Sequence, residues 1–251
     1  MLSKNQIKFL NSLKLKKFRD EHGYFIAEGT KIVPELLNSD IEVLQVYGSE
    51  WFFSSHKISK GTETIEVKPA ELERISALST PNEVLAVCRI PEYQLETKVL
   101  DKRLSLVLDD IRDPGNLGTI IRIADWFGIE NIICSNASAD AFSPKVVQST
   151  MGSIARIKIH YTDLSTFLDG SKMPVYGALL EGKNIYSEKL SSEGFIVIGN
   201  ESKGISPEVQ KLITHKIAIP SFSHFKSGRG EAESLNAAVA TAVICSEFRR
   251  R

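Results

Sequence analysis

Residues 104–126 read LSLVLDDIRDPGNLGTIIRIADW, and this stretch decides the fold of the second half of the chain. A short apolar run, rich in strand-forming residues, is followed by a Pro-Gly turn and then by an apolar helical pattern. Four later runs have the same succession: NIICS, PVYGALL, FIVIGN and KIAIP. Strands that alternate with helices predict an α/β fold with a parallel sheet, and ligands of such sheets bind where the strands end. We therefore expect the functional residues directly after these runs.

The turn after the first run carries the first group of candidate residues. Pro114 and Gly115 suit the two central positions of a type II turn, and Asn116 is a candidate cap for the following helix. From local chemistry alone, Asn116 as a cap and Arg122 as a surface cation would need no catalysis. Three aspartates lie around the turn: Asp109, Asp110 and Asp113. Such aspartates are more often solvated than bound to a metal, so we predict no metal site.

The second group follows the run FIVIGN, in residues 195–207, FIVIGNESKGISP. Gly199 and Gly204 allow the backbone to approach a ligand closely. Ser206 is expected to cap a helix in which Pro207 is the first residue. The segment lacks both the G-x-G-x-x-G spacing and a Walker-type Gly-Lys-Ser/Thr, so neither a dinucleotide site nor a nucleoside-triphosphate site is expected.

The third group follows the run KIAIP. A polar loop over 221–233 leads to Ser234 and Asn236, which open an Ala/Val-rich helix that extends to Phe248. The loop mixes basic and aromatic side chains: Phe222, His224, Phe225, Lys226 and Arg229. This mixture is expected of a surface that contacts phosphates and stacks on bases, and equally of a solvated loop. Ser234 lacks the spacing of a nucleophile elbow, so serine hydrolase chemistry is not supported.

The first hundred residues predict a separate, smaller α/β unit. An amphipathic helix is expected over 5–19. The expected strands are 25–27, 43–47, 64–67 and 84–90, and the further expected helices are 30–37 and 70–78. Residues 91–103, PEYQLETKVLDKR, lose periodicity and gain charge, as an exposed linker does. We predict a first domain over 1–95, a linker over 96–103 and a second domain over 104–251.

Charge and cysteine usage exclude several classes of protein. The chain has 251 residues with 31 basic and 31 acidic side chains, which argues against a protein that holds nucleic acid by bulk electrostatics. Positive charge is nevertheless concentrated in the first 20 residues. The three cysteines, Cys88, Cys134 and Cys245, are too dispersed for a disulfide framework or a zinc site and fit a reducing cytoplasm. The chain shows neither a signal-peptide pattern nor a membrane-spanning run, so we expect a cytoplasmic protein.

Taken together, the three groups resemble the signature motifs of the SpoU/TrmH branch of the SPOUT RNA 2′-O-methyltransferases. The matching patterns are Asn116-x-Gly118-x-x-x-Arg122-x-Ala124, then Gly199-x-Glu201-x-x-Gly204-x-Ser206, then Ile219-Pro220 followed by Ser234-Leu235-Asn236. Each pattern is weak alone, but their joint order and separation are highly specific. Residues 1–95 resemble the L30e-like substrate-binding domain of many members, most clearly in RDEHGYFIAEG, residues 19–29.

The resemblance implies a fold, a cofactor and a set of functional positions. It implies a trefoil knot near the C-terminus, a homodimer with the active site at the dimer interface, and S-adenosylmethionine bound in a bent form against the backbone of the knot loops. The cofactor positions map onto Leu180, Gly199, Ile219 and Leu235. The catalytic positions map onto Asn116, Arg122, Glu201, Ser234 and Asn236. The stretch between Pro220 and Ser234 is longer than the family's usual link, and Lys226 and Arg229 in it could add RNA contacts.

Two mechanisms are open for Arg122. The methyl group passes to a ribose 2′-hydroxyl, which must lose its proton, and the family proposal gives this task to the arginine with the help of an RNA phosphate. A guanidinium is effectively always protonated, however, and a phosphate favours its charged form further. In the second mechanism Arg122 clamps a phosphate and orients the hydroxyl, Ser234 and Asn236 fix the ribose, and Glu201 holds Arg122 or Asn116 in place.

The expected activity is therefore methyl transfer to ribosomal RNA, by analogy with members of this architecture. One alternative is the same chemistry on transfer RNA. Another is an RNA-binding assembly factor that has kept the fold and lost catalysis, in which case the protein need not bind S-adenosylmethionine. A small-molecule enzyme that uses a nucleotide is disfavoured because neither phosphate-binding glycine pattern is present.

Overall fold

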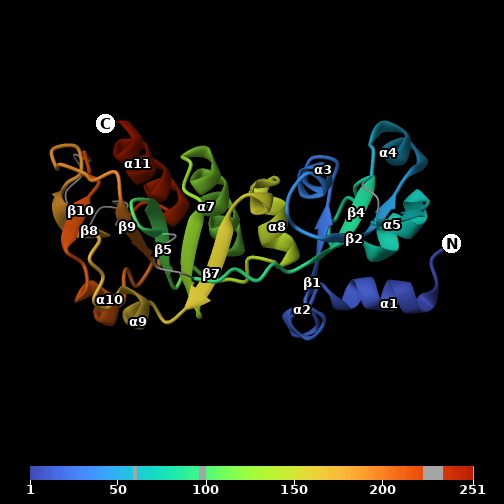
Figure 1. Ribbon diagram of the computed structural model, residues 1–251, viewed down its shortest axis with the longest axis horizontal. Coiled ribbons are helices and arrows are strands. Elements are labelled where there is room, and N and C mark those ends of the chain that lie inside the picture. Colours follow the sequence, from blue (N-terminus) through green and yellow to red (C-terminus); the bar gives the residue numbers. More distant parts are fainter. Residues whose placement is uncertain (59–60, 96–99, 223–233, 251) are drawn as a thin grey trace, which may run out of the picture. The chain divides into compact units, whose positions relative to one another are not determined.

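The computed structural model describes residues 1–58, 61–95, 100–222 and 234–250 (Figure 1). The contacts within it divide the chain into two compact units. The first unit contains residues 1–92 and 140–156, and the second contains residues 93–139 and the chain from 157 onward. The chain therefore passes from one unit to the other three times, after residues 92, 139 and 156. The domain boundary expected at 96–103 stays a prediction, and residues 96–99 lie outside the described chain.

The first unit is built on a four-stranded sheet in the order β1-β4-β2-β3. Its strands are β1 (Tyr24–Glu28), β2 (Val43–Gly48), β3 (Glu63–Glu66) and β4 (Val84–Arg89). β4 pairs antiparallel with both neighbours, and β2 pairs parallel with β3. The helices of this unit are α1 (Lys4–Ser12), α2 (Lys16–His22), α3 (Ile32–Leu37), α4 (Glu50–Ser55), α5 (Pro69–Ile75), α8 (Pro144–Thr150) and the 3₁₀ helix η1 (Ser153–Ala155).

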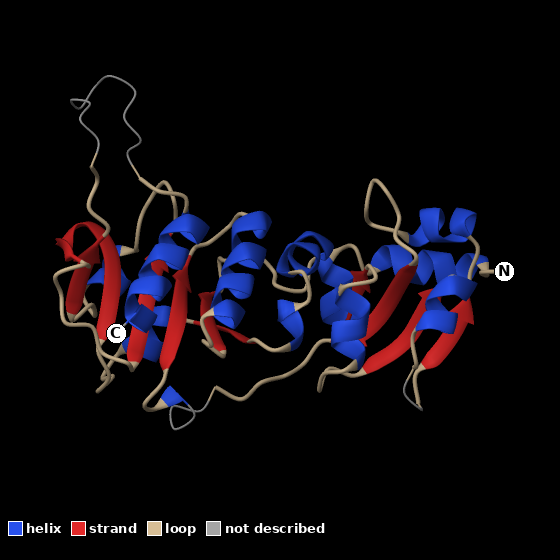
Figure 2. Ribbon diagram, turned by 90° about the horizontal axis from the view of Figure 1, so that it is seen from above, coloured by secondary structure: helices blue, strands red, loops and turns tan. Residues whose placement is uncertain are grey.

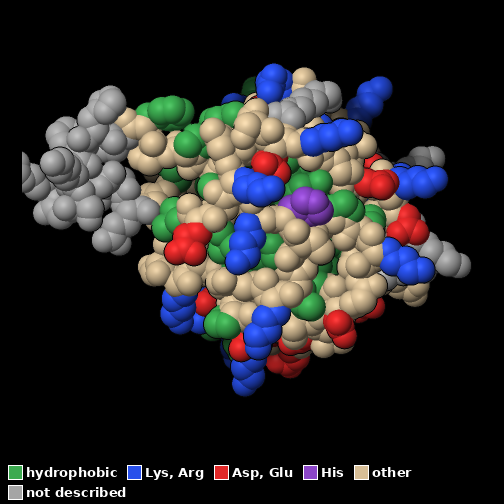
Figure 3. All heavy atoms as spheres, turned by 90° about the vertical axis from the view of Figure 1, so that its left-hand side faces the viewer, with side chains coloured by type: hydrophobic (Ala, Val, Ile, Leu, Met, Phe, Trp, Pro, Cys, Tyr) green, Lys and Arg blue, Asp and Glu red, His purple; other side chains and the backbone are tan. Residues whose placement is uncertain are grey.

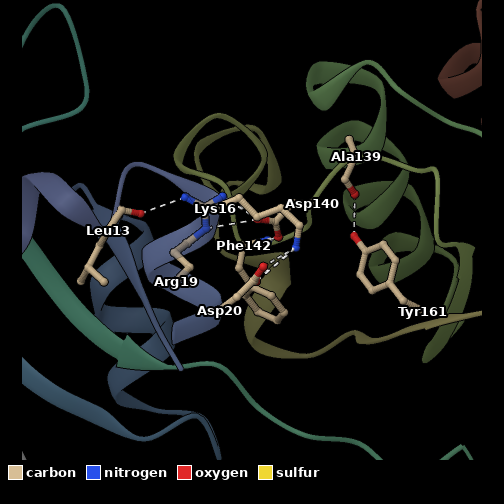
Figure 4. A network of polar contacts seen from close by, with 8 residues as sticks. All are labelled: Leu13, Lys16, Arg19, Asp20, Ala139, Asp140, Phe142 and Tyr161. Carbon is tan, nitrogen blue, oxygen red and sulfur yellow. Dashed lines mark hydrogen bonds and ion pairs between the residues drawn. The ribbon is translucent and has the colours of Figure 1, made fainter. Parts of the chain in front are cut away.

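The single helix expected over 5–19 is wrong, because the chain forms α1 and α2 with a break between them. Leu15 has an extended backbone (φ −100°, ψ 132°) and cannot continue a helix. The break is held by α2, since the Nη1 atom of Arg19 donates to the carbonyl oxygen of Leu13 at 2.9 Å (Figure 4). Leu13 is fully buried in the core while Leu15 is exposed.

The second unit is built on a six-stranded sheet in the order β10-β8-β9-β5-β6-β7, and every neighbouring pair is parallel. The strands are β5 (Leu104–Asp109), β6 (Asn131–Ser135), β7 (Lys158–Thr162), β8 (Val175–Asn184), β9 (Gly194–Gly199) and β10 (His215–Ala218). The helices are α7 (Pro114–Trp126), α9 (Leu164–Leu168), α10 (Pro207–Gln210) and α11 (Ala237–Arg250). The α/β class with a parallel sheet is thereby confirmed. Sequence reasoning missed β7, an edge strand whose sequence KIHYT contains a single aliphatic residue and so forms no apolar run.

Both faces of this sheet are buried, as is usual for parallel sheets. Val107, Ile133 and Val197 belong to a core cluster that also contains the apolar side chains of α9 and α10. Because side chains alternate along a strand, Leu106 and Leu108 of β5 lie on the opposite face. That face is covered by α7 and α11, which lie side by side (Figures 1 and 2) and contact β6 and β9 respectively.

The helices of the described chain include none that is both long enough and apolar enough to cross a membrane. The three cysteines are buried and unpaired. Burial raises the pKa of Cys134 and of Cys245 to about 12, so neither thiol is a nucleophile at neutral pH.

Candidate active site

The loop from β5 to α7 is fixed by neighbours on both sides. The backbone N–H of Asp110 donates to Ser135 Oγ at 2.9 Å, and that of Ile111 donates to Ser138 Oγ at 3.2 Å. From the β9 side, Asn200 Nδ2 donates to the carbonyl oxygen of Asp110 at 2.9 Å. Asp110 has a left-handed backbone (φ 60°), which Asp tolerates better than most residues. The loop is therefore a rigid platform at the strand ends.

The start of α7 differs from the sequence expectation in two ways. Asp113, and not Asn116, is the cap, because its side chain accepts the backbone N–H of Asn116 at 2.8 Å. The expected type II turn is also wrong, since Pro114 and Gly115 are the first two residues of the helix. Pro is favoured at this position because its fixed φ suits a helix and its missing N–H would have no intrahelical partner. Asn116 thus keeps its side chain for other contacts.

Asn116 joins two other predicted site residues in a chain of hydrogen bonds. Its Nδ2 donates to Glu201, and its Oδ1 accepts from Asn236 Nδ2 at 2.9 Å. Asn236 also caps α11, because its Oδ1 accepts the backbone N–H groups of Ala238 at 3.0 Å and Val239 at 3.3 Å. Three segments far apart in the sequence, those after β5, β9 and β10, therefore meet through their polar side chains. Such a chain of amide and carboxylate groups can orient a polar ligand at the strand ends.

The loop after β9 presents Glu201 to this network. Its two ends meet where Asn200 and Gly204 form an isolated bridge. A Cβ atom on Gly199 would lie 2.3 Å from the carbonyl carbon of Gly204, so only glycine fits there. Ser206 and Pro207 occupy the expected cap and first helical positions of α10. The Ser206 side chain makes no capping bond, and the backbone N–H of Ser206 instead donates to Asp109 Oδ2 at 2.7 Å.

The other two predicted catalytic residues are not joined to the network. Arg122 lies on α7, exposed and without a hydrogen-bond or ion-pair partner among the described residues. Ser234 is exposed and borders the segment 223–233, which lies outside the described residues. That segment contains the expected RNA-contacting side chains His224, Phe225, Lys226 and Arg229; Phe222 is described and exposed.

Of the positions expected to hold the cofactor, Leu180 lies within β8, Gly199 ends β9, Ile219 follows β10 and Leu235 precedes α11. The pairing of β8 with β10 steps from Gly177 directly to Lys183, so residues 178–182 leave the ladder. A Cβ atom on Gly182 would lie 2.3 Å from the carbonyl carbon of Ile217, which fixes the end of this excursion against β10. The excursion leaves the side chain of Leu180 79% exposed, and Leu235 is 48% exposed. Exposed apolar side chains such as these can pack against the apolar part of a ligand.

Sequence reasoning missed the residues that support the site. Asp110, Ser135, Ser138 and Asn200 hold the β5–α7 loop, and each follows or ends a strand at its carboxyl end. That rule of position could have found them. The described chain contains no group of three or more His, Cys, Asp or Glu side chains placed to hold a metal ion.

Known proteins resemble the chain over its whole length. Residues 103–246 match the model of the SpoU rRNA Methylase family, and residues 4–86 match the MRM3-like substrate binding domain. The 23S rRNA (guanosine(2553)-2′-O)-methyltransferase RlmP of Bacillus subtilis is 31% identical, over 98% of this chain and 97% of its own. A Porphyromonas gingivalis structure described as a TrmH-family RNA methyltransferase superposes with a TM-score of 0.88 at 39% identity, covering 100% of this chain and 99% of that one. An AdoMet-bound rRNA methyltransferase from Sinorhizobium meliloti superposes with a TM-score of 0.86 at 28% identity, covering 100% and 96%.

Proposed function

Because this chain belongs to the SpoU rRNA methylase family, we propose that it transfers a methyl group from S-adenosylmethionine to a ribose 2′-hydroxyl of ribosomal RNA. The observation that carries the proposal is the hydrogen-bonded chain from Asn236 through Asn116 to Glu201 at the strand ends. It unites the three segments that carry the family motifs. The match over nearly the full length of the B. subtilis enzyme, which acts on 23S rRNA, supports ribosomal RNA as the substrate.

S-adenosylmethionine is assigned to the loops that contain Leu180, Gly199, Ile219 and Leu235. The S. meliloti relative holds AdoMet, and the exposed apolar side chains of the excursion and of Leu235 fit an adenosyl group. The bound cofactor supplies a methyl group on a positively charged sulfur, which is the electrophile of the reaction. The trefoil knot that the family resemblance implies would place these loops around it.

We assign the site residues by their contacts. Asn116 and Asn236 position the ribose, and Glu201 holds Asn116 in the required orientation. Arg122 acts as the phosphate clamp, because its exposed guanidinium has no partner among the described residues and can bind a phosphate through two parallel N–H groups. Ser234 completes the ribose contacts. The alternative role of Arg122 as the base predicts the same severe loss of activity when the residue is removed.

The first unit is assigned to RNA binding, in agreement with its match to a substrate-binding domain.

We further propose a homodimer that works in the cytoplasm. Trp126 at the C-terminal end of α7 is 85% exposed, and Val239 near the N-terminal end of the neighbouring α11 is 51% exposed. A second copy that packs along both helices would cover these two apolar side chains. Sedimentation equilibrium of the wild type and of Trp126→Glu measures this, since the charged variant should dissociate.

The test is methyl transfer from labelled S-adenosylmethionine to total RNA from a strain that lacks this protein, with 2′-O-methylation mapped in the product. Label should enter ribosomal RNA with the wild type and should be lost with Arg122→Ala. The matched control is Arg103→Gln, at the opposite end of β5, which should keep the activity. Label in transfer RNA alone would keep the chemistry and overturn the substrate. Absence of cofactor binding would instead favour the non-catalytic assembly factor.

A further inference from the structure

Arg112 lies four residues before Asn116 on the pinned β5–α7 loop, and the family motifs do not include it. Its Nε donates to Asp110 Oδ1 at 2.6 Å. The Arg112 side chain is 61% exposed, whereas that of Asp110 is only 17% exposed. From this geometry we propose that Arg112 grips a phosphate of the RNA next to the target ribose, and that Asp110 is the residue that positions it. The proposal rests on the function proposed above and deepens it.

The way in which Asp110 holds Arg112 leaves the phosphate-binding edge of the guanidinium available. Only Nε is bonded, and no acceptor for Nη1 or Nη2 is found among the described residues. Two parallel N–H groups are the geometry with which Arg binds a phosphate in two places at once. A guanidinium whose orientation is fixed in advance loses less conformational entropy when it binds.

Asp110 is itself held more firmly than an ordinary loop residue. Its backbone N–H and its carbonyl oxygen are both bonded, to Ser135 and Asn200. Its left-handed backbone (φ 60°) is a conformation that costs free energy and persists only where the surroundings impose it. Strain of this kind gathers at functional sites. Here it turns the carboxylate toward Arg112, in the same loop that places Asn116.

The ion pair between Arg112 and Asp110 does not have an important role in holding the fold together. Because the Arg112 side chain is exposed, its pairing with Asp110 contributes little to folding, so the chain does not need it for stability. The whole chain carries no net charge, and on the face of the second unit seen in Figure 3 the basic side chains are interspersed with acidic ones. Because the chain has no net charge, we expect individual arginines at defined places to contribute to the binding of RNA near the reacting ribose.

The test measures RNA binding and methylation separately. Arg112→Gln, Arg112→Lys and Asp110→Asn are compared with Arg103→Gln, whose arginine is 51% exposed and paired with Glu130 at 2.5 Å, at the other end of β5. Filter binding to ribosomal RNA at several salt concentrations gives the affinity and its salt dependence. Steady-state methylation gives KM and kcat, and calorimetry gives the affinity for S-adenosylmethionine.

Arg112→Gln should weaken RNA binding and raise the KM for RNA, each about tenfold. It should also reduce the slope of log affinity against log salt by about one. Cofactor affinity should be unchanged. Arg112→Lys should keep the slope and lose part of the affinity, because an ammonium keeps the charge without the two-point geometry. Asparagine tolerates the left-handed backbone of position 110 as aspartate does. Asp110→Asn should therefore raise the KM for RNA while leaving the salt slope near that of the wild type.

A merely structural role of Arg112 is detected by the same measurements. Wild-type KM and salt slope in Arg112→Gln would overturn the inference, as would an effect equal to that of Arg103→Gln. Lower cofactor affinity in Arg112→Gln would also overturn it, because the loop would then be damaged as a whole. If the wild type methylates no RNA, the proposed function fails, and the salt slope of RNA binding still decides whether Arg112 contacts a phosphate.

Discussion

At the scale of single residues, the site depends on which atom of each amide faces which neighbour. Asn116 donates to Glu201 with Nδ2 and accepts from Asn236 with Oδ1, so replacing either group removes one of the two bonds. A carboxylate in place of the Asn116 amide keeps the acceptor and removes the donor. It also sets two negative charges side by side, which raises the pKa of one of them.

We therefore expect Asn116→Asp to lower kcat by roughly a hundredfold or more at pH 8, the order of loss when one preorganised group is removed from a site. The loss should be smaller at pH 5.5, because protonation of one carboxyl restores a donor between the two side chains. Methylation rates at both pH values measure this, relative to the wild type at each pH. The control is Asn184→Asp, where the side-chain oxygen accepts the N–H of Tyr186 at 3.0 Å and the carboxylate can do the same. Equal loss at the two pH values would contradict the explanation that activity falls because the hydrogen-bond donor to Glu201 is missing.

The structure joins three of the five predicted catalytic residues by hydrogen bonds and corrects the local role expected for Asn116. Asn116 looked like a helix cap because Pro-Gly before it resembles a turn, but Asp113 is the better-placed cap and a proline is welcome at the first helical position. The joining of Asn116, Glu201 and Asn236 was expected only through a family resemblance, since nothing in a sequence encodes contacts across 85 and 120 residues. The roles of Arg122 and Ser234 stay predictions.

At the scale of elements, the break between α1 and α2 shows what a buried ion pair does. Arg19 is almost fully buried and donates from Nε and Nη2 to Asp140 Oδ2, at 3.1 and 2.5 Å, as well as to Leu13 (Figure 4). Asp140 accepts the N–H of Phe142 with its other oxygen, at 2.9 Å. One guanidinium thus holds the end of α1 and the segment before α8. The apolar stripe of 5–19 gave no sign of this, because the partner lies 121 residues away.

Arg19→Gln should accordingly destabilise the protein by about 3 to 5 kcal/mol, because it removes a buried guanidinium and leaves the partly buried carboxylate of Asp140 without its charged partner. The control lies in the same helix. Lys16→Gln removes an exposed pair with Asp20 at 3.1 Å, and should cost no more than about 0.5 kcal/mol. Denaturant unfolding of the three proteins measures the difference. Similar losses for the two variants would show that Arg19 is not the residue that holds the break.

At the scale of the whole molecule, the distribution of charge differs from what the sequence predicts. The first 20 residues contain six basic side chains, yet three of them are paired or hydrogen-bonded to other groups of the protein. Arg19 is paired in the interior, Lys16 is paired with Asp20, and Lys14 Nζ donates to the carbonyl oxygen of Ser76 at 2.6 Å. Burial is the largest cause that lowers the pKa of Lys14, and the nearby Glu28 opposes it. A count of basic residues in the sequence therefore overstates the number of cationic side chains that are available to bind RNA.

Lys4 and Lys8 are exposed and lie one turn apart on the same face of α1, so they are the cations of this region best placed for phosphates. Changing both to Gln should weaken binding to ribosomal RNA and reduce the salt slope by about two, one for each phosphate that is no longer neutralised. Filter binding measures both quantities.

The rate at saturating RNA should stay that of the wild type, since neither lysine belongs to the second unit, which holds the proposed catalytic residues. The double change Lys172→Gln and Lys211→Gln removes the same charge from exposed positions of the second unit and should leave the slope unchanged. If instead both pairs reduce the slope equally, RNA is held by overall charge, and α1 has no special part in binding it.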